Sequence, residues 1–303
     1  MAYHPARLIM AAGRGVLIAP RCTEGRVMDI ERDVARHYTH GSLEGAILGA
    51  LASTGKDVDH LDTADLSAAD EFHLGWLAQT VELAKQLDLS PGMTVLDIGA
   101  GIGGPARYFA KAHGCRVTGI DLTDEFVQVA ESLTRRCGLA DQVNFQTGSG
   151  LALPYDSETF DVATLIHVGM NIADKATLFG EARRVLKWGG RFGVYDIMRA
   201  SPDPLPYPMP WAHTAETSFV ETPETYRQLL TAAGFEIAKE RDRSAFALQL
   251  GREMRENAER NGVPPLGLHT LMGPATKERL ANVMDALQRG LIAPVEIIAV
   301  KMK

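Results

Sequence analysis

Apolar and polar positions follow one another along the chain in a pattern that predicts short buried strands separated by amphipathic helices. The apolar runs TVLDI, RVTGID, VNFQTG, FDVATLI and RFGVYDI are separated by segments with helical spacing. Strands that alternate with helices in this way form a parallel sheet joined by helical crossovers. The pattern therefore predicts an α/β fold whose first strands are residues 94–98, 116–121, 143–148, 160–166 and 191–197.

The chain before the first strand is predicted to be helical. Residues 28–90 carry helical patterns that a turn-rich segment from Ser53 to Asp70 interrupts. The stretch FHLGWLAQTVELAKQLDL is amphipathic, and the Ser-Pro-Gly sequence that follows it ends a helix. We expect residues 28–90 to form a helical N-terminal lid on the domain of residues 91–303.

After the fifth strand the pattern changes to a long loop. Five prolines lie in the stretch SPDPLPYPMP, which excludes a regular helix or a central strand. A helix then begins at Pro223 with Thr222 as its N-cap, and the strand GFEIAKERD follows. A mostly helical segment precedes a final strand at residues 294–302. The insertions expected in the domain are residues 198–221 and 244–290.

The first 27 residues differ in composition from the rest of the chain. They hold four arginines against one glutamate, and their apolar patch LIMAAG stops at Arg14. That patch is too short to span a bilayer or to form the centre of a signal peptide. We expect residues 1–27 to be a disordered tail or an extension upstream of Met28, with a transit peptide as the alternative.

The overall composition limits the classes of partner that the chain is expected to bind. The chain has 303 residues, a hydrophobic content of 46% and a net charge of −7, without a long run of Lys or Arg. Such a chain has no general attraction to nucleic acid or to an anionic membrane, so a small molecule is the expected partner. The three cysteines form no C-x-x-C motif and leave an odd thiol, which favours a cytoplasmic location. Self-association into a homo-oligomer is compatible with this composition.

A glycine-rich turn follows the first strand, in the sequence TVLDIGAGIGGPARYFA. Gly99, Gly101 and Gly104 fit the spacing G-x-G-x-x-G, which lets the backbone approach a cofactor closely. Asp97 lies two residues before the first glycine, where its carboxylate would repel a pyrophosphate and attract an ammonium group. Asp121, at the end of the second strand, is placed to accept hydrogen bonds from a ribose. NAD and S-adenosylmethionine both carry that ribose, and Asp97 favours the second.

Two further segments support that choice: LPYDSETFDV leads into the fourth strand and EARRVLKWGGRF into the fifth. Together with GAGIGGPARYFA they resemble motifs of the class I S-adenosylmethionine-dependent methyltransferases, in the group of the ubiquinone/menaquinone, sterol, tocopherol and sarcosine/dimethylglycine enzymes. The resemblance covers about residues 72–235. It implies a doubly wound, Rossmann-like sheet of seven strands with the last strand antiparallel, and S-adenosyl-L-methionine as the cofactor.

The resemblance also assigns cofactor contacts to matching positions. Asp97 and the glycines would hold the methionine part, Asp121 the ribose hydroxyls, and Leu122 would pack on the adenine. Many members of the family have an Asp at the position of Ser149, and its carboxylate accepts the adenine amino group; here only a hydroxyl or a backbone carbonyl could do so. The expected cofactor-binding residues are His73, Asp97, Gly99, Ala100, Gly101, Asp121, Leu122, Gly148, Ser149, Gly150 and His167.

His167 and Tyr38 are the candidates for catalysis. His167 follows the fourth strand at the carboxyl edge of the sheet, where it could orient the acceptor or take its proton. Tyr38 resembles the lid tyrosine that relatives place near the sulfonium, and His73 lies in EFHLGW, a segment that in relatives folds over the cofactor. A packing role is the alternative for each. His37 and His40 lie three residues apart, but no carboxylate cluster completes a metal site, so no metal is expected.

The acceptor pocket is expected to form from later segments of the chain. Its candidate residues are Tyr195, Trp211, His213, His269 and Met272. Aromatic rings near a cationic amine gain about 0.5–2 kcal/mol from a cation–π interaction, and N-methylation of a small amine or amino acid is the preferred prediction. The alternative within the family is C- or O-methylation of a quinone, phenol or other natural product. Outside it, the alternatives are a nicotinamide-dependent oxidoreductase and a non-catalytic cofactor-binding protein.

Overall fold

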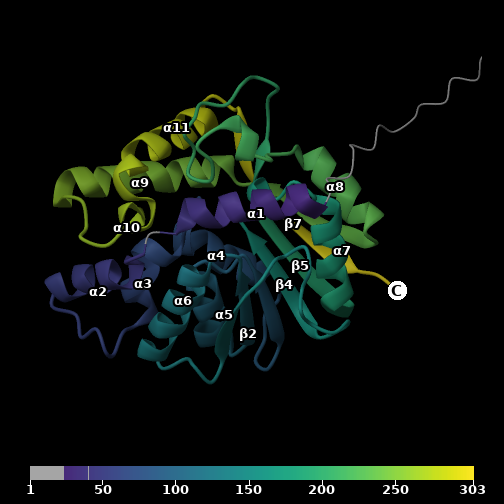
Figure 1. Cartoon of the computed structure of the whole chain (residues 1–303), viewed down its shortest axis with the longest axis horizontal. Coiled ribbons are helices and arrows are strands. Elements are labelled where there is room, and N and C mark those ends of the chain that lie inside the picture. Colours follow the sequence, from purple (N-terminus) through teal and green to yellow (C-terminus); the bar gives the residue numbers. More distant parts are fainter. Residues whose placement is uncertain (1–23, 40) are drawn as a thin grey trace, which may run out of the picture.

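A computed structural model describes residues 24–39 and 41–303 (Figure 1). Its strands are β1 (Thr94–Ile98), β2 (Arg116–Asp121), β3 (Val143–Thr147), β4 (Phe160–Ile166), β5 (Leu186–Arg199), β6 (Phe235–Asp242) and β7 (Ile292–Lys301). Within the described residues they form one seven-stranded sheet in the order β3-β2-β1-β4-β5-β7-β6. Strands β1 to β5 are parallel, and β7 is antiparallel to both β5 and β6. The predicted α/β, Rossmann-like fold is therefore confirmed.

Helices cover both faces of the sheet. One face packs against α7 (Lys175–Val185) and α8 (Pro223–Ala232), through side chains such as Phe179 and Leu230. The other face packs against α4 (Trp76–Gln86), α5 (Gly104–His113) and α6 (Asp124–Arg136), as at Leu83 and Phe109. Because both faces are covered, the central strands β1 and β4 are buried along almost their whole length.

A second group of helices lies over the carboxyl edge of the parallel strands (Figure 1). The proline-rich loop packs with α9 (Ser244–Asn261) and α11 (Thr276–Gln288) around Trp211 and Leu287. Helices α2 (Leu43–Ser53), α3 (Thr63–Asp70) and α10 (Leu268–Met272) share a core with α6. In Figure 1, α1 (Glu24–Tyr38) runs between α9 and α11 on one side and the sheet on the other. The proline-rich loop, α9, α11 and α1 thus cover this edge of the sheet.

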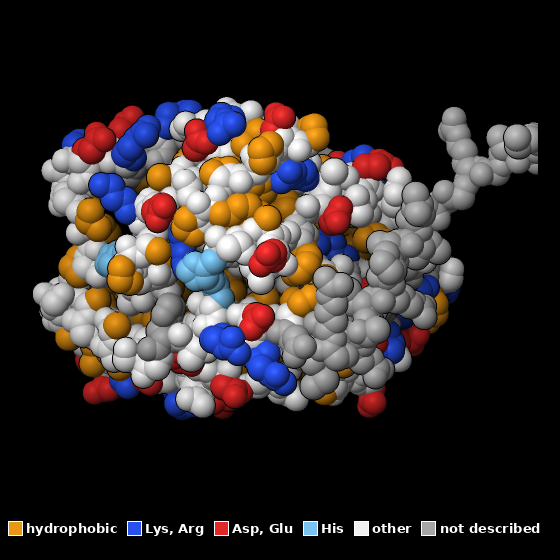
Figure 2. All heavy atoms as spheres, turned by 45° about the horizontal axis from the view of Figure 1, so that its top comes forward, with side chains coloured by type: hydrophobic (Ala, Val, Ile, Leu, Met, Phe, Trp, Pro, Cys, Tyr) orange, Lys and Arg blue, Asp and Glu red, His pale blue; other side chains and the backbone are white. Residues whose placement is uncertain are grey.

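The described surface carries charges of both signs. Figure 2 shows acidic and basic side chains intermingled over the face turned forward, with apolar side chains between them. None of the helices in residues 24–39 and 41–303 combines the length and the apolar character that a bilayer span needs.

Helix α3 lies inside the segment for which the sequence predicts turns. The Asp62 carboxylate accepts a hydrogen bond from the Ala64 N–H at 2.9 Å, and the Asp65 carboxylate accepts one from the Asp62 N–H at 2.9 Å. This reciprocal arrangement is a capping box, which satisfies N–H groups that have no partner within the helix. The prediction is therefore wrong for the second half of the segment, because Asp62 and Asp65 cap a helix instead of forming a turn.

Several predicted boundaries differ from the structure, and the larger differences have a local cause. The amphipathic stretch that starts at Phe72 becomes helical only at Trp76, since Gly75 has a φ of +94° and caps α4. Strand β5 begins at Leu186 and not at residue 191, because Leu186 already pairs with β4 across a bulge. Helix α1 begins at Glu24, so the end of the predicted tail is helical. The rest of the tail and His40 lie outside the described residues.

A buried ion pair ties α3 to α5 beside the glycine-rich turn. The Arg107 guanidinium donates to the Asp70 carboxylate at 2.9 Å and to the Ile102 carbonyl at 2.7 Å. The side chains of Arg107 and Asp70 are 0% and 3% exposed. A Cβ on Gly104 would lie 2.2 Å from the Asp70 carbonyl oxygen, so only glycine fits where the two helices meet. The pair thus joins the N-terminal helices to the turn that holds the site.

Candidate functional site

The glycine-rich turn joins β1 to α5 at the carboxyl edge of the sheet. Gly99 and Gly101 have φ angles of +74° and +55°, which residues with a side chain rarely adopt. The Gly99 N–H donates to the Ile120 carbonyl at 2.8 Å, and a Cβ on Gly99 would lie 2.2 Å from the Val168 side chain. Glycine is therefore needed for this turn to fit against β2 and the segment after β4.

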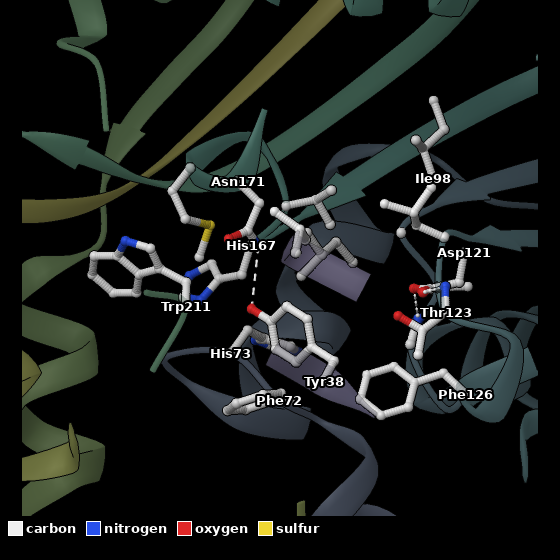
Figure 3. A pocket seen from close by; sticks show the side chains of 18 of the residues that line it. Tyr38, Phe72, His73, Ile98, Asp121, Thr123, Phe126, His167, Asn171 and Trp211 are labelled. Atoms are coloured by element: carbon white, nitrogen blue, oxygen red, sulfur yellow. Dashed lines mark hydrogen bonds between the residues drawn. The ribbon is translucent and has the colours of Figure 1, made fainter. Parts of the chain in front are cut away.

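The turn borders a cavity of about 190 Å³ that α1 helps to enclose (Figure 3). Most of the residues predicted from the sequence line it. They are Tyr38, His73, Asp97, Gly99, Ala100, Gly101, Asp121, Leu122, Gly148, Ser149, Gly150, His167 and Trp211. The cavity therefore brings together side chains from the segment before β1, the carboxyl ends of four strands and the proline-rich loop.

Four residues predicted to contact the acceptor lie outside this lining. They are Tyr195, His213, His269 and Met272. Tyr195 packs against His167, with 5.0 Å between ring centroids, and its hydroxyl donates to the Leu74 carbonyl at 2.6 Å. His213 lies with its Nε2 atom 3.1 Å from the Arg279 guanidinium. Position in the sequence does not show whether the side chain of such a residue points into the cavity or away from it.

Asp97 offers an unpaired acceptor to the cavity. Its side chain is buried, and one carboxylate oxygen accepts a hydrogen bond from the Thr164 hydroxyl at 2.7 Å. The other oxygen, Oδ2, is buried without a partner among the described residues. Burial raises the pKa of Asp97 to about 6. A buried acceptor without a donor is costly, so the site fits a ligand that brings an ammonium group.

Asp121 is fixed by the backbone at the end of β2. Its carboxylate accepts hydrogen bonds from the Gly101 N–H at 2.8 Å and the Thr123 N–H at 2.9 Å. Burial raises its pKa, and the two N–H groups oppose that shift. Each carboxylate oxygen has more than one lone pair, so Asp121 retains capacity to accept hydrogen bonds from ribose hydroxyls. Asp97 and Asp121 together fit S-adenosyl-L-methionine.

His167 has an unusual backbone and a neutral ring. Its φ is +53°, and its N–H donates to the Tyr195 carbonyl at 2.8 Å. Burial, and to a smaller extent the electrostatic effect of the neighbouring His73, lowers the pKa of His167 well below its usual value. The ring Nε2 is buried and has no hydrogen-bond partner in the part of the chain that the structure describes. A strained residue with a neutral imidazole at the edge of a cavity can offer a ring nitrogen to a ligand.

His73 is held by an acid that sequence reasoning missed. Its Nε2 lies 2.8 Å from the Glu71 carboxylate, and the Thr80 hydroxyl donates to the same carboxylate at 2.6 Å. The His73 and His167 rings meet edge to face at 5.8 Å between centroids. Glu71 is buried, and its only sequence signal is its place two residues before His73. Glu71 thus orients His73 against His167.

Tyr38 reaches the same region from α1, as Figure 3 shows. Its hydroxyl accepts a hydrogen bond from the Asn171 amide at 3.2 Å, and its ring packs against Phe72 and Phe126. Burial raises the pKa of Tyr38 to about 12, so the phenol keeps its proton at neutral pH. Asn171 was not predicted from the sequence, because it follows β4 in an apolar segment without a recognisable motif.

Known proteins share this sequence pattern. A family model described as "Methyltransferase domain" matches residues 96–194. The sarcosine/dimethylglycine N-methyltransferase of Halorhodospira halochloris is 32% identical over 187 residues, which are 61% of this chain and 67% of that protein. Methyltransferase GfsG of Streptomyces halstedii is 30% identical over 182 residues, 60% of this chain and 64% of that protein. Matches to two fungal sterol 24-C-methyltransferases, from Gibberella zeae and Eremothecium gossypii, cover only 30% and 45% of those proteins.

Solved structures share the fold. The crystal structure of the [4+2]-cyclase SpnF has a TM-score of 0.64 and 24% identity, covering 90% of this chain and 96% of that chain. Phosphoethanolamine N-methyltransferase 2 of Haemonchus contortus, solved in complex with S-adenosyl-L-methionine, has a TM-score of 0.64 and 20% identity over 77% of this chain and 54% of that chain. With the sequence match extending over two thirds of one curated relative, this chain belongs to the class I S-adenosylmethionine-dependent methyltransferases.

Proposed function

We propose that this chain transfers a methyl group from S-adenosylmethionine to a hydroxyl group of an apolar small molecule. The observation that carries the proposal is the chemistry of the cavity wall formed by α1, η1 (Gly169–Asn171), β5, the proline-rich loop, α10 and α11. Its apolar members are Ile30, Val34, Met170, Ile197, Trp211, Leu268, Leu271, Leu280 and Val283. Among the described residues that line the cavity there is no Lys or Arg.

The lack of a lining cation bears on the choice of acceptor. A carboxylate or phosphate enclosed by an apolar wall needs a charged partner, and Arg or Lys usually provides it. The described lining residues supply carboxylates instead, at Glu31, Asp70, Asp97, Asp121 and Asp174. Trp211 also has no free donor, because its indole N–H donates to the Ser218 hydroxyl at 2.9 Å. This favours an acceptor without an acidic group, and it counts against the amino acid among the acceptors, a small amine or an amino acid, that the sequence first suggested.

A hydroxyl acceptor must lose its proton as the new O–CH₃ bond forms, and His167 is the residue suited to take it. When bound, S-adenosylmethionine supplies an electrophilic methyl group on its sulfonium. Burial keeps the His167 ring neutral and makes it a weaker base, but methylation of the oxygen makes the hydroxyl proton strongly acidic. The ring can therefore still accept this proton and pass it to solvent when the site opens. Tyr38 stays protonated and is fixed by Asn171, which lets it donate a hydrogen bond to the acceptor oxygen. Helix α1 and the apolar wall exclude water.

The proposal is tested with a panel of acceptors of similar size. The panel holds apolar phenols and alcohols, neutral amines, and amino acids, each incubated with the protein and S-adenosylmethionine. We expect S-adenosylhomocysteine to form with the apolar hydroxyl compounds and the product to carry one added methyl group on oxygen. Methylation confined to amino acids would contradict the proposal. Tight cofactor binding without any methylated product would favour a non-catalytic role, and binding of NADH in its place would favour an oxidoreductase.

Changing Asp97 to Asn should weaken S-adenosylmethionine binding about tenfold or more. The substitution keeps the shape of the side chain but removes the charge that attracts the cofactor's ammonium, and a charge-assisted hydrogen bond is worth about 1.5–3 kcal/mol. Calorimetry measures the affinity, and the exposed Asp141, changed to Asn, is the control for lost negative charge. An Asp97→Asn variant with the affinity of the parent protein would remove Asp97 from the cofactor site.

The affinity for S-adenosylmethionine should also fall as the pH is lowered through about 6. The pKa of Asp97 is raised to about 6 in the free protein, so its carboxylate gains a proton over this range and loses its attraction for the ammonium. Calorimetry between about pH 5 and about pH 8 should show affinity rising to a plateau. The Asp97→Asn variant should have a flatter profile. The same pH dependence in both proteins would assign it to another group.

A further inference from the structure

The cavity wall contains a carboxylate from the lid helix whose role the proposed reaction does not explain. The Ser149 hydroxyl, after β3, donates a hydrogen bond to the Glu31 carboxylate of α1. Both residues line the cavity. The Ser149 oxygen also accepts from the Leu151 N–H at 3.0 Å, which holds the hydroxyl in place. Glu31 is thus fixed over the segment of residues 148–151, although the two segments are far apart in sequence.

The strand order determines which part of the cofactor lies there. Asp97 ends β1, Asp121 ends the neighbouring β2, and Ser149 follows β3, the next strand outward. With the ammonium at Asp97 and the ribose at Asp121, the adenine extends toward Ser149. His167 follows β4, on the other side of β1, so the reacting centre lies away from this end.

An enclosed adenine has an exocyclic amino group that needs an acceptor. Of the other carboxylates in the described lining, Asp70 is paired with Arg107, and Asp174 caps α7 by accepting from the Thr177 N–H at 3.0 Å. Asp97 and Asp121 belong to the other two parts of the cofactor. Glu31 is the carboxylate that remains.

We infer that the Glu31 carboxylate accepts a hydrogen bond from the exocyclic amino group of the cofactor's adenine, so that the lid helix itself recognises the cofactor. This rests on the cofactor assigned above and not on the nature of the acceptor. Helix α1 also supplies Ile30, Val34 and Tyr38 to the cavity. A hydrogen bond between adenine and Glu31 would therefore hold α1 in the position where it completes the wall of the acceptor pocket. For this reason the cofactor should bind before the acceptor does.

The experiment compares S-adenosylhomocysteine with S-inosylhomocysteine, in which an oxygen replaces the amino group. Calorimetry without any acceptor gives both affinities, so turnover is not needed. We expect the parent protein to prefer the adenine ligand by about tenfold or more, the size of a charge-assisted hydrogen bond. Glu31→Gln should lose most of that preference, because an amide can donate to the inosine oxygen. Asp33→Asn, an equal loss of charge at an exposed position of α1, should keep it.

The Ser149→Ala variant separates recognition from lid closure. It removes the hydrogen bond between Ser149 and Glu31 but keeps the carboxylate, so the preference for adenine should persist. A Glu31→Gln variant that keeps the full preference would overturn the inference. Equal weakening of both ligands would also overturn it, since that would mean Glu31 only closes the lid. If the parent protein bound neither ligand, the cofactor assignment itself would be wrong.

Discussion

Replacing His167 with alanine should lower turnover by about 10²–10⁴, the usual contribution of general acid–base catalysis, with little change in S-adenosylmethionine affinity. The imidazole is kept neutral by burial and lies on the edge of the cavity, so it can take the acceptor's proton. Turnover is measured at saturating cofactor with the best acceptor of the panel. Calorimetry on the same variant measures the cofactor affinity.

His113 offers a matched control. Its Nε2 is also buried with no partner among residues 24–39 and 41–303, but the residue does not line the cavity. His113→Ala should have the turnover of the parent protein. With a phenolic acceptor, raising the pH toward about 10, near the pKa of a phenol, should restore part of the turnover lost by His167→Ala. Parent-like turnover across the pH range would remove His167 from the mechanism. If His167→Ala instead had a lower melting temperature and a modest loss of turnover that a higher pH did not restore, His167 would have a packing role.

Changing Arg107 to Met should lower the free energy of unfolding by about 3–5 kcal/mol, the cost of leaving one member of a buried ion pair without its partner. Asp70 would then be a buried carboxyl without a cation, and the Ile102 carbonyl would lose its donor. The loss should be smaller at acid pH. The pKa of Asp70 is already raised to about 6 by burial and would rise further without Arg107, so protonation would remove the unpaired charge. Urea denaturation at several pH values measures both effects.

The double variant Asp70→Asn, Arg107→Met is the control for that experiment. It removes both charges, so it should unfold at a higher urea concentration than Arg107→Met alone at neutral pH. A loss below about 1 kcal/mol in the single variant would be typical of an exposed ion pair and would contradict the assigned role.

The sheet and the cofactor end of the site follow from local patterns. Alternating apolar runs mark each strand, and Asp97, Gly99 and Asp121 lie within a few residues of strand ends whose neighbours are fixed by parallel topology. The backbone geometry at Gly99 explains why this part was predictable. The positive φ angle of the turn favours glycine at this position, so a glycine in the sequence is itself evidence for the turn.

The acceptor side depends on contacts between distant segments, which no local pattern encodes. Tyr38 meets Asn171 across 133 residues, and Ser149 meets Glu31 across 118. Tyr195 shows the same limit, since strand alternation shows that its side chain leaves one face of β5 but not that His167 and Leu74 would cover it. Such positions are decided by how helices and loops pack over the sheet.

The place of β7 between β5 and β6 sets the order in which the sheet can be completed during synthesis. Among the described residues β6 pairs with no strand except β7, which follows it only after α9, α10 and α11 have been made. During synthesis β6 therefore emerges from the ribosome before β7 has been made. The edge of β5 that β7 later covers is unpaired during the same period. Unpaired strand edges can join other chains. A nascent chain stalled before Ile292 therefore exposes two unpaired strand edges to other chains.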